Sequence, residues 1–332
     1  MEYVRLGSAG LKVSRLALGC MSFGSRERDA FRWTLGEEEA RPLFRRALEA
    51  GINLFDTADA YSRGASEIIV GRLLKELAHR DEVIIATKVF ATMGAGPNDR
   101  GLSRKHIMAS IDASLARLQT DHVDLYQIHR FDDETPMEET LEALNDVVRA
   151  GKALYVGAST MHAWQLARML AASERHGRSR FASMQLQWNP TYREEEREMV
   201  PLCLAEGIGL LAWSPLAGGF LAHGKATPEE GITERGRTPS PLGTPHDRAP
   251  DRRSFEAVAA IARARGVSNA EVVYAWCRTR PGLSSALIGA TQLSHLDQAI
   301  ASLQLTLSTE EIEEIERHYE AQAVYGHRVK PH

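Results

Sequence analysis

The sequence predicts an α/β fold in which eight parallel strands close into a (β/α)8 TIM barrel. Short apolar, β-branched runs alternate along the chain with longer segments of helical periodicity, which is the pattern of repeated βα units and a parallel sheet. A polar or functional residue ends one strand after another. Such ends converge on one face of a closed barrel, whereas an open, doubly wound sheet would leave edge strands away from a single crevice. We therefore expect residues 1–332 to form one barrel domain.

The first expected element is an N-terminal hairpin. Residues 1–15 have a charged, alternating pattern with a turn at residues 8–10, and we expect this hairpin to plug the end of the barrel away from the strand ends. The eight barrel strands expected after it are LALG (16–19), INLF (52–55), VIIAT (83–87), VDLYQI (123–128), LYVGA (154–158), ASM (182–184), GLLA (209–212) and ALIG (286–289).

Amphipathic helices are expected between the strands. Two of them show apolar residues at helical spacing, namely Ile107, Ile111, Leu115 and Leu118 in one and Leu141, Leu144 and Val148 in the other. Thr34 and Glu37 have the spacing of a capping box at the start of the first helix, and Gly51 stands where a C-terminal glycine of that helix belongs.

Two segments need a separate interpretation. Residues 218–250 are rich in Gly and Pro and carry Arg235 and Arg237, and a long insertion in a compact domain is usually a functional lid or a disordered segment. Because this insertion follows the seventh strand, we expect a long loop that covers cofactor or substrate. The acidic run EEERE (194–198) is expected to be an exposed helix face.

Composition excludes several classes of partner. The chain has a formal net charge of −4 and no long Lys/Arg cluster, which argues against nucleic acid and anionic membranes. Cys20, Cys203 and Cys277 lie far apart and match no metal-ligand spacing, so we expect a reducing compartment and no metal site. No run approaches the ~18 apolar residues of a membrane span, and the cytoplasm is the expected location. The oligomeric state is left open.

Two glycine-rich segments imitate nucleotide-binding motifs. GIGLLA (207–212) fits G-x-G-x-x-A but runs directly into an apolar strand, whereas that motif lies between a strand and a helix. GFLAHGK (219–225) is similar to a P-loop, but Ala226 stands where the metal-binding Ser or Thr belongs, and Pro228 does not suit an immediate helix. We expect a strand at the first segment and a loop, not an ATP site, at the second.

Four residues at or beyond consecutive strand ends form a chemically coherent set. Asp56 ends one buried strand, and Tyr61 lies in the loop beyond it. Lys88 ends the next strand, and His129 ends the one after. Singly, each has an ordinary structural explanation, such as a turn cap, a packed ring, an exposed lysine or a core histidine. On consecutive strands of a barrel, however, we expect them to meet at one face.

This set suits the reduction of a carbonyl group. Hydride transfer to a carbonyl produces an alkoxide-like oxygen that needs a proton and stabilising donors. Tyr61 would donate the proton, and the Lys88 cation would lower the pKa of that phenol. Asp56 would hold Lys88 charged, because an unpaired buried ammonium is costly. His129 would orient the carbonyl and help to polarise it.

Over essentially its whole length the chain resembles the aldo-keto reductase superfamily. The segments that carry this resemblance are RLGSAGLKVSRLALGCMSFG (5–24), FDTADAYSRGASEIIVG (55–71), ATKV (86–89), QIHR (127–130), GKALYVGAS (151–159), MQ (184–185), WSPLAGG (213–219) and IGATQLSHLDQAI (288–300). Residues 135–153 and 192–203 further resemble the bacterial, aryl-alcohol-dehydrogenase-like branch. The resemblance implies a catalytic tetrad of Asp56, Tyr61, Lys88 and His129, with Tyr61 as general acid.

The same resemblance implies a site for NADPH, with NADH as the alternative. The implied contacts are Ser159 and Gln185 on the nicotinamide carboxamide, Trp213 on its ring, Ser214, Leu216 and Gly218 at the pyrophosphate, and Gly289, Thr291, His295 and Gln298 at the adenosine phosphate end. A helix N-terminus after the last strand offers amide donors to a phosphate.

The chain departs from the family pattern at three places. Thr160 follows the serine of G-x-S, where members often have Asn or Arg. Thr291 and Gln292 stand where many members carry a cation for the 2′-phosphate of NADPH, and Ala299 replaces a frequent Asn. The expectation of NADPH therefore follows from the family and not from these residues, unless an arginine of the long loop supplies the charge.

The leading interpretation is an NADPH-dependent reductase of a small-molecule aldehyde or ketone. Two alternatives stay open: an enzyme forming 1-deoxyxylulose 5-phosphate, associated with a relative in the same branch, and a non-catalytic regulatory subunit like the potassium-channel β subunits. A Schiff-base lyase would need an unpaired lysine of low pKa, which Asp56 disfavours at Lys88. The substrate pocket is expected among Met21, Phe23, Trp33, Phe90, Phe131, Tyr325 and His327.

Overall fold

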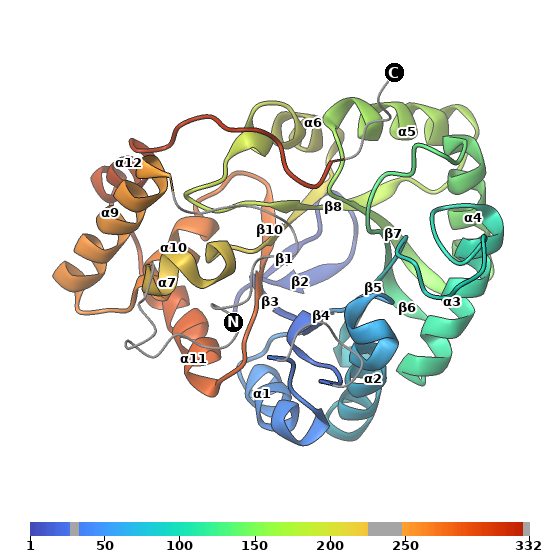
Figure 1. The fold of residues 1–332 in the computed structure, drawn as a ribbon, viewed down its shortest axis with the longest axis horizontal. Helices are drawn as coiled ribbons and strands as arrows, with labels where there is room; N and C mark the ends of the chain where they lie inside the picture. The colour runs from blue at the N-terminus through green and yellow to red at the C-terminus, as the bar shows by residue number, and fades with distance from the viewer. Residues whose placement is uncertain (27–32, 225–247, 328–332) are drawn as a thin grey trace.

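The computed structural model describes residues 1–26, 33–224 and 248–327, and in these residues eight parallel strands form a closed barrel (Figure 1). Their order around the barrel is β10-β3-β4-β5-β6-β7-β8-β9, which confirms the predicted fold class. The bounds are Leu16–Gly19 (β3), Leu54–Asp56 (β4), Ile84–Val89 (β5), Val123–Ile128 (β6), Ala153–Ser159 (β7), Phe181–Gln187 (β8), Gly209–Trp213 (β9) and Leu283–Ile288 (β10).

Helices follow the strands in sequence and surround them (Figure 1). They are Glu37–Glu49 (α1), Ala65–Leu77 (α2), Arg104–Leu118 (α3), Met137–Arg149 (α4), Ala163–Arg175 (α5), Met199–Glu206 (α6), Phe220–His223 (α7), Ala249–Arg265 (α9), Asn269–Arg278 (α10), Leu293–Ala301 (α11) and Thr309–Glu316 (α12). The apolar stripe predicted for α3 is buried against the barrel as part of the main core. Burial of this apolar surface, at roughly 25 cal/mol per Å², stabilises the packing of helix on sheet.

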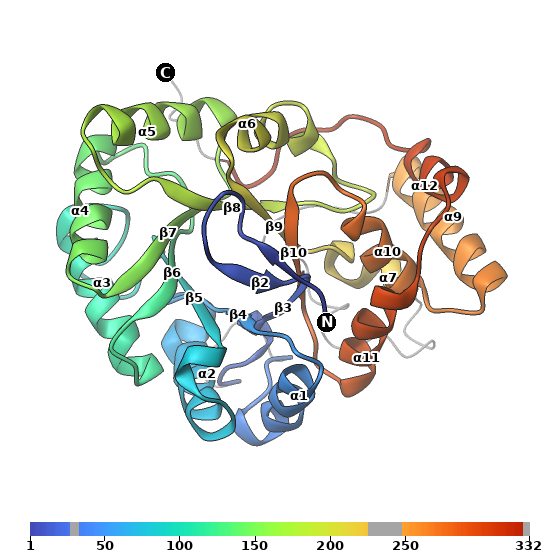
Figure 2. The same ribbon diagram turned by 180° about the vertical axis from the view of Figure 1, so that it is seen from behind.

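The N-terminal hairpin closes the amino-terminal end of the barrel, as Figure 2 shows from behind. Tyr3–Arg5 (β1) pairs antiparallel with Lys12–Ser14 (β2). The hairpin inserts Leu6 and Val13 into a second apolar cluster, whose other members come from the strands. Ser8 donates a backbone hydrogen bond of 2.7 Å to Gly207 O, just before β9. The barrel interior is therefore a packed core at this end, and the site has to lie at the other.

The close approach of the hairpin to β9 depends on glycine. Gly7 has φ +58°, and a Cβ placed there would lie 2.3 Å from Gly207 O and 2.4 Å from Gly209 N. Both neighbours are backbone atoms, so no side-chain rotation can relieve the clash. We expect Gly7→Ala to lower the free energy of unfolding by about 2–4 kcal/mol, from left-handed strain plus overpacking, as measured by urea denaturation.

Gly151→Ala is the matched control for this prediction. Gly151 also has a left-handed φ, +72°, but no heavy atom lies within 4 Å of an added Cβ. This variant should lose only the conformational part, about 1 kcal/mol. Equal losses at the two positions would contradict the argument from close approach.

Two local predictions at loops and caps are corrected by the structure. Helix α1 is capped by Gly36 and Glu39, whose Oε2 accepts from Gly36 N at 2.9 Å, and not by the Thr34–Glu37 pair. The predicted 218–250 loop begins with an ordered turn and the short helix α7, and α9 already starts at Ala249. Arg235 and Arg237 lie outside the described residues.

The prediction that the acidic run 194–198 is an exposed helix face is wrong at the start of the run, whereas Arg197 and Glu198 are exposed. Glu194 is 7% and Glu195 6% exposed, in a short 3-10 turn after β8. Glu194 accepts hydrogen bonds from the Tyr319 hydroxyl and, at 2.8 Å, from Gln322 N. The prediction failed because the partners that bury these carboxylates come from the far end of the chain.

These contacts fix the C-terminal tail across the carboxyl-end face of the barrel. In Figure 1 the tail runs from α12 past α6 toward α5. Tyr325 N donates to the Tyr192 hydroxyl at 3.2 Å, and His327 Nε2 lies 3.2 Å from Glu195 Oε1. A Cβ on Gly326 would lie 3.2 Å from Thr160 Cγ2. The described part of the tail, up to His327, therefore lies beside the loop that follows β7.

Candidate active site

The four residues of the predicted tetrad come from three neighbouring strands and the turn after the first of them. Asp56 is the last residue of β4, Lys88 lies near the end of β5, and His129 directly follows β6. Tyr61 opens the 3-10 turn Tyr61–Gly64 beyond β4. The strands β4, β5 and β6 pair in parallel, so their carboxyl ends bring these side chains to the same end of the barrel.

Lys88 is the centre of the group. Its ammonium donates to Asp56 Oδ1 at 2.5 Å, to Thr57 O at 2.9 Å and to the Tyr61 hydroxyl at 3.2 Å. Lys88 is 0% and Asp56 1% exposed. All three protons of the ammonium therefore have acceptors, which is the condition for keeping a cation buried.

Two glutamines hold the other oxygen of Asp56. Gln185 Nε2 donates to Asp56 Oδ2 at 2.8 Å, and Gln127 Nε2 donates to the same oxygen at 3.0 Å. Sequence reasoning missed Gln127, which pairs in register with Lys88 across β5 and β6. The signal was present as a polar residue inside the apolar strand VDLYQI, two residues before His129.

Tyr61 is presented by a strained turn. Ser62 and Arg63 both have left-handed backbones, with φ 50° and 51°, a conformation that costs residues with a Cβ about 1–2 kcal/mol each. The Tyr61 ring lies edge-on to the His129 ring, with centroids 5.8 Å apart. The Lys88 ammonium lies 4.9 Å from the centroid of the Tyr61 ring. Phenol, imidazole and ammonium thus form one cluster.

Burial controls the protonation of this cluster. Burial raises the pKa of Tyr61, and the nearby Lys88 cation lowers it only in part. Lys88 lowers the pKa of Tyr61, as predicted, but desolvation of the phenolate outweighs this attraction, so the net shift of that pKa is upward. Burial also lowers the pKa of Lys88, but Asp56 and Tyr61 overcome this effect and the net shift is upward.

His129 is neutral for two reasons. Burial lowers its pKa well below the usual value, and the positive charges of Lys88 and Arg130 lower it further. A neutral imidazole can donate one hydrogen bond without adding charge. The cluster therefore combines an ammonium paired with a carboxylate, a protonated phenol and a neutral imidazole.

Two of the three residues predicted for the nicotinamide end, Ser159 and Trp213, are joined through Thr160. Ser159, at the end of β7, has its Oγ 3.1 Å from Thr160 Oγ1. Trp213, at the end of β9, donates from Nε1 to the same hydroxyl at 3.2 Å. Gln185 is tied to Asp56, as described above. These three residues therefore border the tetrad on the β7–β9 side.

The predicted pyrophosphate turn has a backbone suited to an anion. Ser214, Ala217, Gly218 and Gly219 all have positive φ, and Gly218 N donates to Ser214 Oγ at 3.1 Å. Leu216 caps the 3-10 turn Ala217–Gly219. A Cβ on Gly218 or Gly219 would meet no heavy atom of the described residues within 4 Å. Successive amides in such turns form anion-binding concavities, and this one has open space before it.

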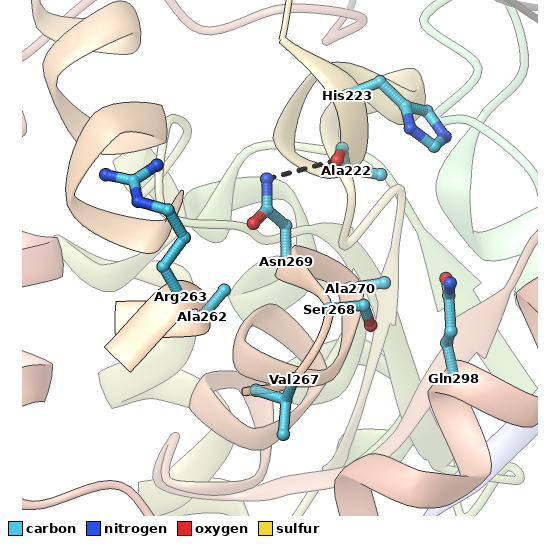
Figure 3. A pocket seen from close by; sticks show the side chains of 9 residues that line it. All are labelled: Ala222, His223, Ala262, Arg263, Val267, Ser268, Asn269, Ala270 and Gln298. Atoms are coloured by element: carbon cyan, nitrogen blue, oxygen red, sulfur yellow. Dashed lines mark hydrogen bonds between the residues drawn. The ribbon is translucent and has the colours of Figure 1, made fainter. Parts of the chain in front are cut away.

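The residues predicted for the adenosine end lie on the loop after β10 and on α11. Gly289 is exposed directly after β10, and Thr291 N lies 3.4 Å from His295 Nδ1. Gln298 on α11 borders a cavity of about 300 Å³, shown in Figure 3. Gly289, Thr291 and His295 do not line it.

The other walls of this cavity come from residues that sequence reasoning missed. Asn269, at the start of α10, donates to Ala222 O at 3.2 Å. In Figure 3, His223 and Gln298 lie on one side of Asn269, and Arg263 of α9 lies on the other. No sequence motif indicates this cavity, because its walls come from four separate helices, α7, α9, α10 and α11.

The residues predicted for the substrate pocket lie in different parts of the structure. Phe23 is 0% exposed and packs on Phe44, with ring centroids 5.1 Å apart, so it belongs to the core and not to a pocket. Phe131 and Trp164 lie beyond β6 and β7 with centroids 6.3 Å apart. His327 packs on His162, with centroids 4.6 Å apart, which places the tail next to the loop after β7.

The described ranges contain neither a cluster of metal ligands nor a helix that could span a membrane. Within residues 1–26, 33–224 and 248–327, no three His, Cys, Asp or Glu side chains are grouped as ligands of a metal ion. In the same part of the chain, no helix is long and apolar enough to cross a membrane.

Comparison with known proteins shows which family and which relatives the chain is similar to. Residues 15–320 match the model of the aldo/keto reductase family. The chain is 40% identical to versiconal hemiacetal acetate reductase of Aspergillus parasiticus, over 98% of this chain and 99% of the relative. It is 37% identical to an aldo-keto reductase of Metarhizium robertsii, over 98% of this chain and 93% of the relative.

A third relative bears on the branch. The chain is 38% identical to a putative aryl-alcohol dehydrogenase of Schizosaccharomyces pombe, over 96% of this chain and 95% of the relative. The aryl-alcohol-dehydrogenase-like resemblance is thus matched by a named relative, while these three relatives are fungal where a bacterial branch had been expected.

Proposed function

The chain belongs to the aldo/keto reductase family, and on that premise we propose that it reduces an aldehyde or ketone to an alcohol with NADPH, Tyr61 being the general acid. It is an oxidoreductase, as its family and its relatives named as reductases show. We further propose that the chain works as a single barrel domain. The tetrad, the cofactor contacts and NADPH itself are parts of this proposal.

The observation that carries the proposal is the position of the Lys88 ammonium. It donates to the Tyr61 hydroxyl at 3.2 Å and to Asp56 at 2.5 Å. As the phenol gives up its proton, the developing phenolate is stabilised by a cation already in place, which is where electrostatic preorganisation is most effective. Asp56 and its two glutamine donors keep that cation fixed.

His129 has a separate role in this proposal. Its ring lies edge-on to Tyr61, and burial keeps it neutral. A neutral imidazole donates a hydrogen bond to a carbonyl oxygen and so orients it toward the Tyr61 proton. The paired state of Lys88 also favours reduction over Schiff-base chemistry, which requires a free amine.

The chain's own residues fit a nicotinamide cofactor, which supplies the hydride when bound. Ser159, Gln185 and Trp213 would hold the nicotinamide, and the left-handed turn with Ser214, Leu216 and Gly218 would hold the pyrophosphate. The open space in front of Gly218 and Gly219 supports this assignment. Gly289, Thr291, His295 and Gln298 would contact the adenosine end.

The test is cofactor oxidation followed by absorbance against a panel of carbonyl compounds. Aromatic aldehydes come first, because one relative is named as an aryl-alcohol dehydrogenase; aliphatic ketones and sugar phosphates follow. We expect turnover with at least one carbonyl and a kcat/KM at least about 10-fold higher with NADPH than with NADH, an advantage of about 1.4 kcal/mol.

Binding of NADP⁺ and NAD⁺ to the free protein, followed by quenching of tryptophan fluorescence, provides a readout independent of turnover. Equal affinity for the two would refute the NADPH preference and leave the reductase assignment intact. Absence of oxidation with every carbonyl, despite cofactor binding, would favour a cofactor-binding regulatory protein instead.

A further inference from the structure

A buried acid, unpaired within the described residues, lies two residues before Tyr61, at the start of the turn that holds this tyrosine. Asp59 is 0% exposed, and among the described residues neither of its carboxyl oxygens has a hydrogen-bond partner of normal geometry. Its backbone is fixed, since Asp59 N donates to Lys88 O at 3.2 Å. Tyr61 N in turn donates to Ala58 O at 3.2 Å. The backbone on both sides of this side chain is thus fixed, while the carboxyl group itself is buried and unpaired within the described part of the chain.

The cations that act on Asp59 are engaged by other acids. Arg117 Nε of α3 donates to Glu67 Oε2 of α2 at 2.6 Å. Glu67 is itself 0% exposed and also accepts from Thr87 Oγ1 at 2.6 Å. Lys88 of β5 is bound to Asp56. Two buried acids, Asp59 and Glu67, are therefore near one arginine, and Arg117 is hydrogen-bonded to Glu67.

These surroundings favour the neutral form of Asp59. An unpaired buried carboxylate is so costly that the group takes up a proton instead. Burial, and next the charge of Glu67, raise the pKa of Asp59 to about 8. The Ala60 amide, Arg117 and Lys88 lower this pKa, but their effect is smaller. Tyr126 of β6 faces the same region, and burial together with both acids raises its pKa well above the usual value, so it stays a neutral phenol.

We propose that the folded enzyme carries Asp59 as a neutral carboxylic acid at neutral pH, and that release of this proton to solvent base at alkaline pH loosens the turn of Tyr61. Once ionised, Asp59 repels Glu67. The turn can then change its conformation at Ser62 and Arg63, whose left-handed backbones are strained. Asp59 is then a positioning residue that acts through Tyr61. Its effect on catalysis rests on the proposed function, whereas its protonation does not.

The consequence for stability has a definite sign. The folded state holds the proton up to a pKa of about 8, and the unfolded state only up to about 4. The stabilisation from this proton is complete below about pH 4, decreases as pH rises to about 8, and is constant above. Asp59→Asn cannot ionise, so its Tm should exceed that of the wild type increasingly across this range, by at least about 3 °C at pH 8, and level off above it.

The experiment combines infrared spectroscopy with thermal unfolding on the full chain. We expect a protonated carboxyl band in the wild type at pH 7 that is lost near pH 8 and is missing in Asp59→Asn. Asp81→Asn, at an exposed acid, is the control. It should keep the carboxyl band of the wild type and show no pH-dependent Tm difference from the wild type. The alkaline decline of kcat should be steeper in the wild type than in Asp59→Asn.

A second variant keeps the test decisive if Asp59→Asn fails to fold. Glu67→Gln removes the competing charge and releases Arg117 to Asp59, so the band should be lost at lower pH than in the wild type. Absence of the band at pH 7 in the wild type, or a constant Tm difference between Asp59→Asn and wild type, would overturn the proposal. Failure of the proposed function looks different, because turnover would be missing while band and Tm behave as expected.

Discussion

Tyr61→Phe should reduce kcat for the best carbonyl substrate by at least about 100-fold, the lower range of general acid catalysis. The substitution removes the hydroxyl that lies 3.2 Å from the Lys88 ammonium and keeps the ring that packs edge-on to His129. Cofactor affinity should change little, because the proton donor acts in the transition state and not in the binding of the cofactor. Steady-state kinetics and fluorescence binding measure the two effects separately.

Tyr3→Phe is the matched control for this loss. The Tyr3 hydroxyl donates to Gly51 O at 2.8 Å, on the hairpin at the opposite end of the barrel. Loss of that partly exposed hydrogen bond should leave kcat within about twofold of the wild type, since a single hydrogen bond remote from the reaction affects stability and not the barrier. If Tyr61→Phe turned over as fast as Tyr3→Phe, another group would have to be the acid.

Lys88→Met should lower both activity and stability. The ammonium joins three acceptors in the cluster, and its loss leaves the Asp56 carboxylate buried with only the two glutamine donors. Removing one partner of a buried ion pair typically costs about 3–5 kcal/mol, which urea denaturation would detect. The kcat should fall by about 10²–10⁴-fold, because the developing phenolate loses its counter-charge.

The double variant Lys88→Met/Asp56→Asn separates these two effects. Neutralising Asp56 removes the stranded charge, so most of the lost free energy of unfolding should return. Activity should not return, because no cation remains beside Tyr61. A double variant that was as unstable as Lys88→Met alone would show that packing of the lysine side chain, and not its charge, supports the fold.

The sequence predicted more of the fold than of its local details. The alternation of strands and helices is a local property of the chain, set by the period of apolar residues, and all eight predicted strands are present in the barrel. The cap of α1 was wrong, because Thr34 and Gly36 both precede an acidic residue at suitable spacing and only packing chooses between them. Phe23 was misplaced because an aromatic ring near a strand end suits a core as well as a pocket.

For the candidate site, the sequence alone determined which residues stand at the strand ends, and hence that Asp56, Tyr61, Lys88 and His129 reach one face of the barrel. Only the tertiary structure decided which groups pair at that face. Gln127 donates to Asp56, Asp59 has no hydrogen-bond partner among the described residues, and the C-terminal tail buries Glu194. The physical reason is that strand ends follow from periodicity within one segment, whereas burial and pairing depend on which distant segments compete for the same space and the same cation. The sequence does not show whether a given carboxylate is solvated, paired with an arginine or buried without a partner.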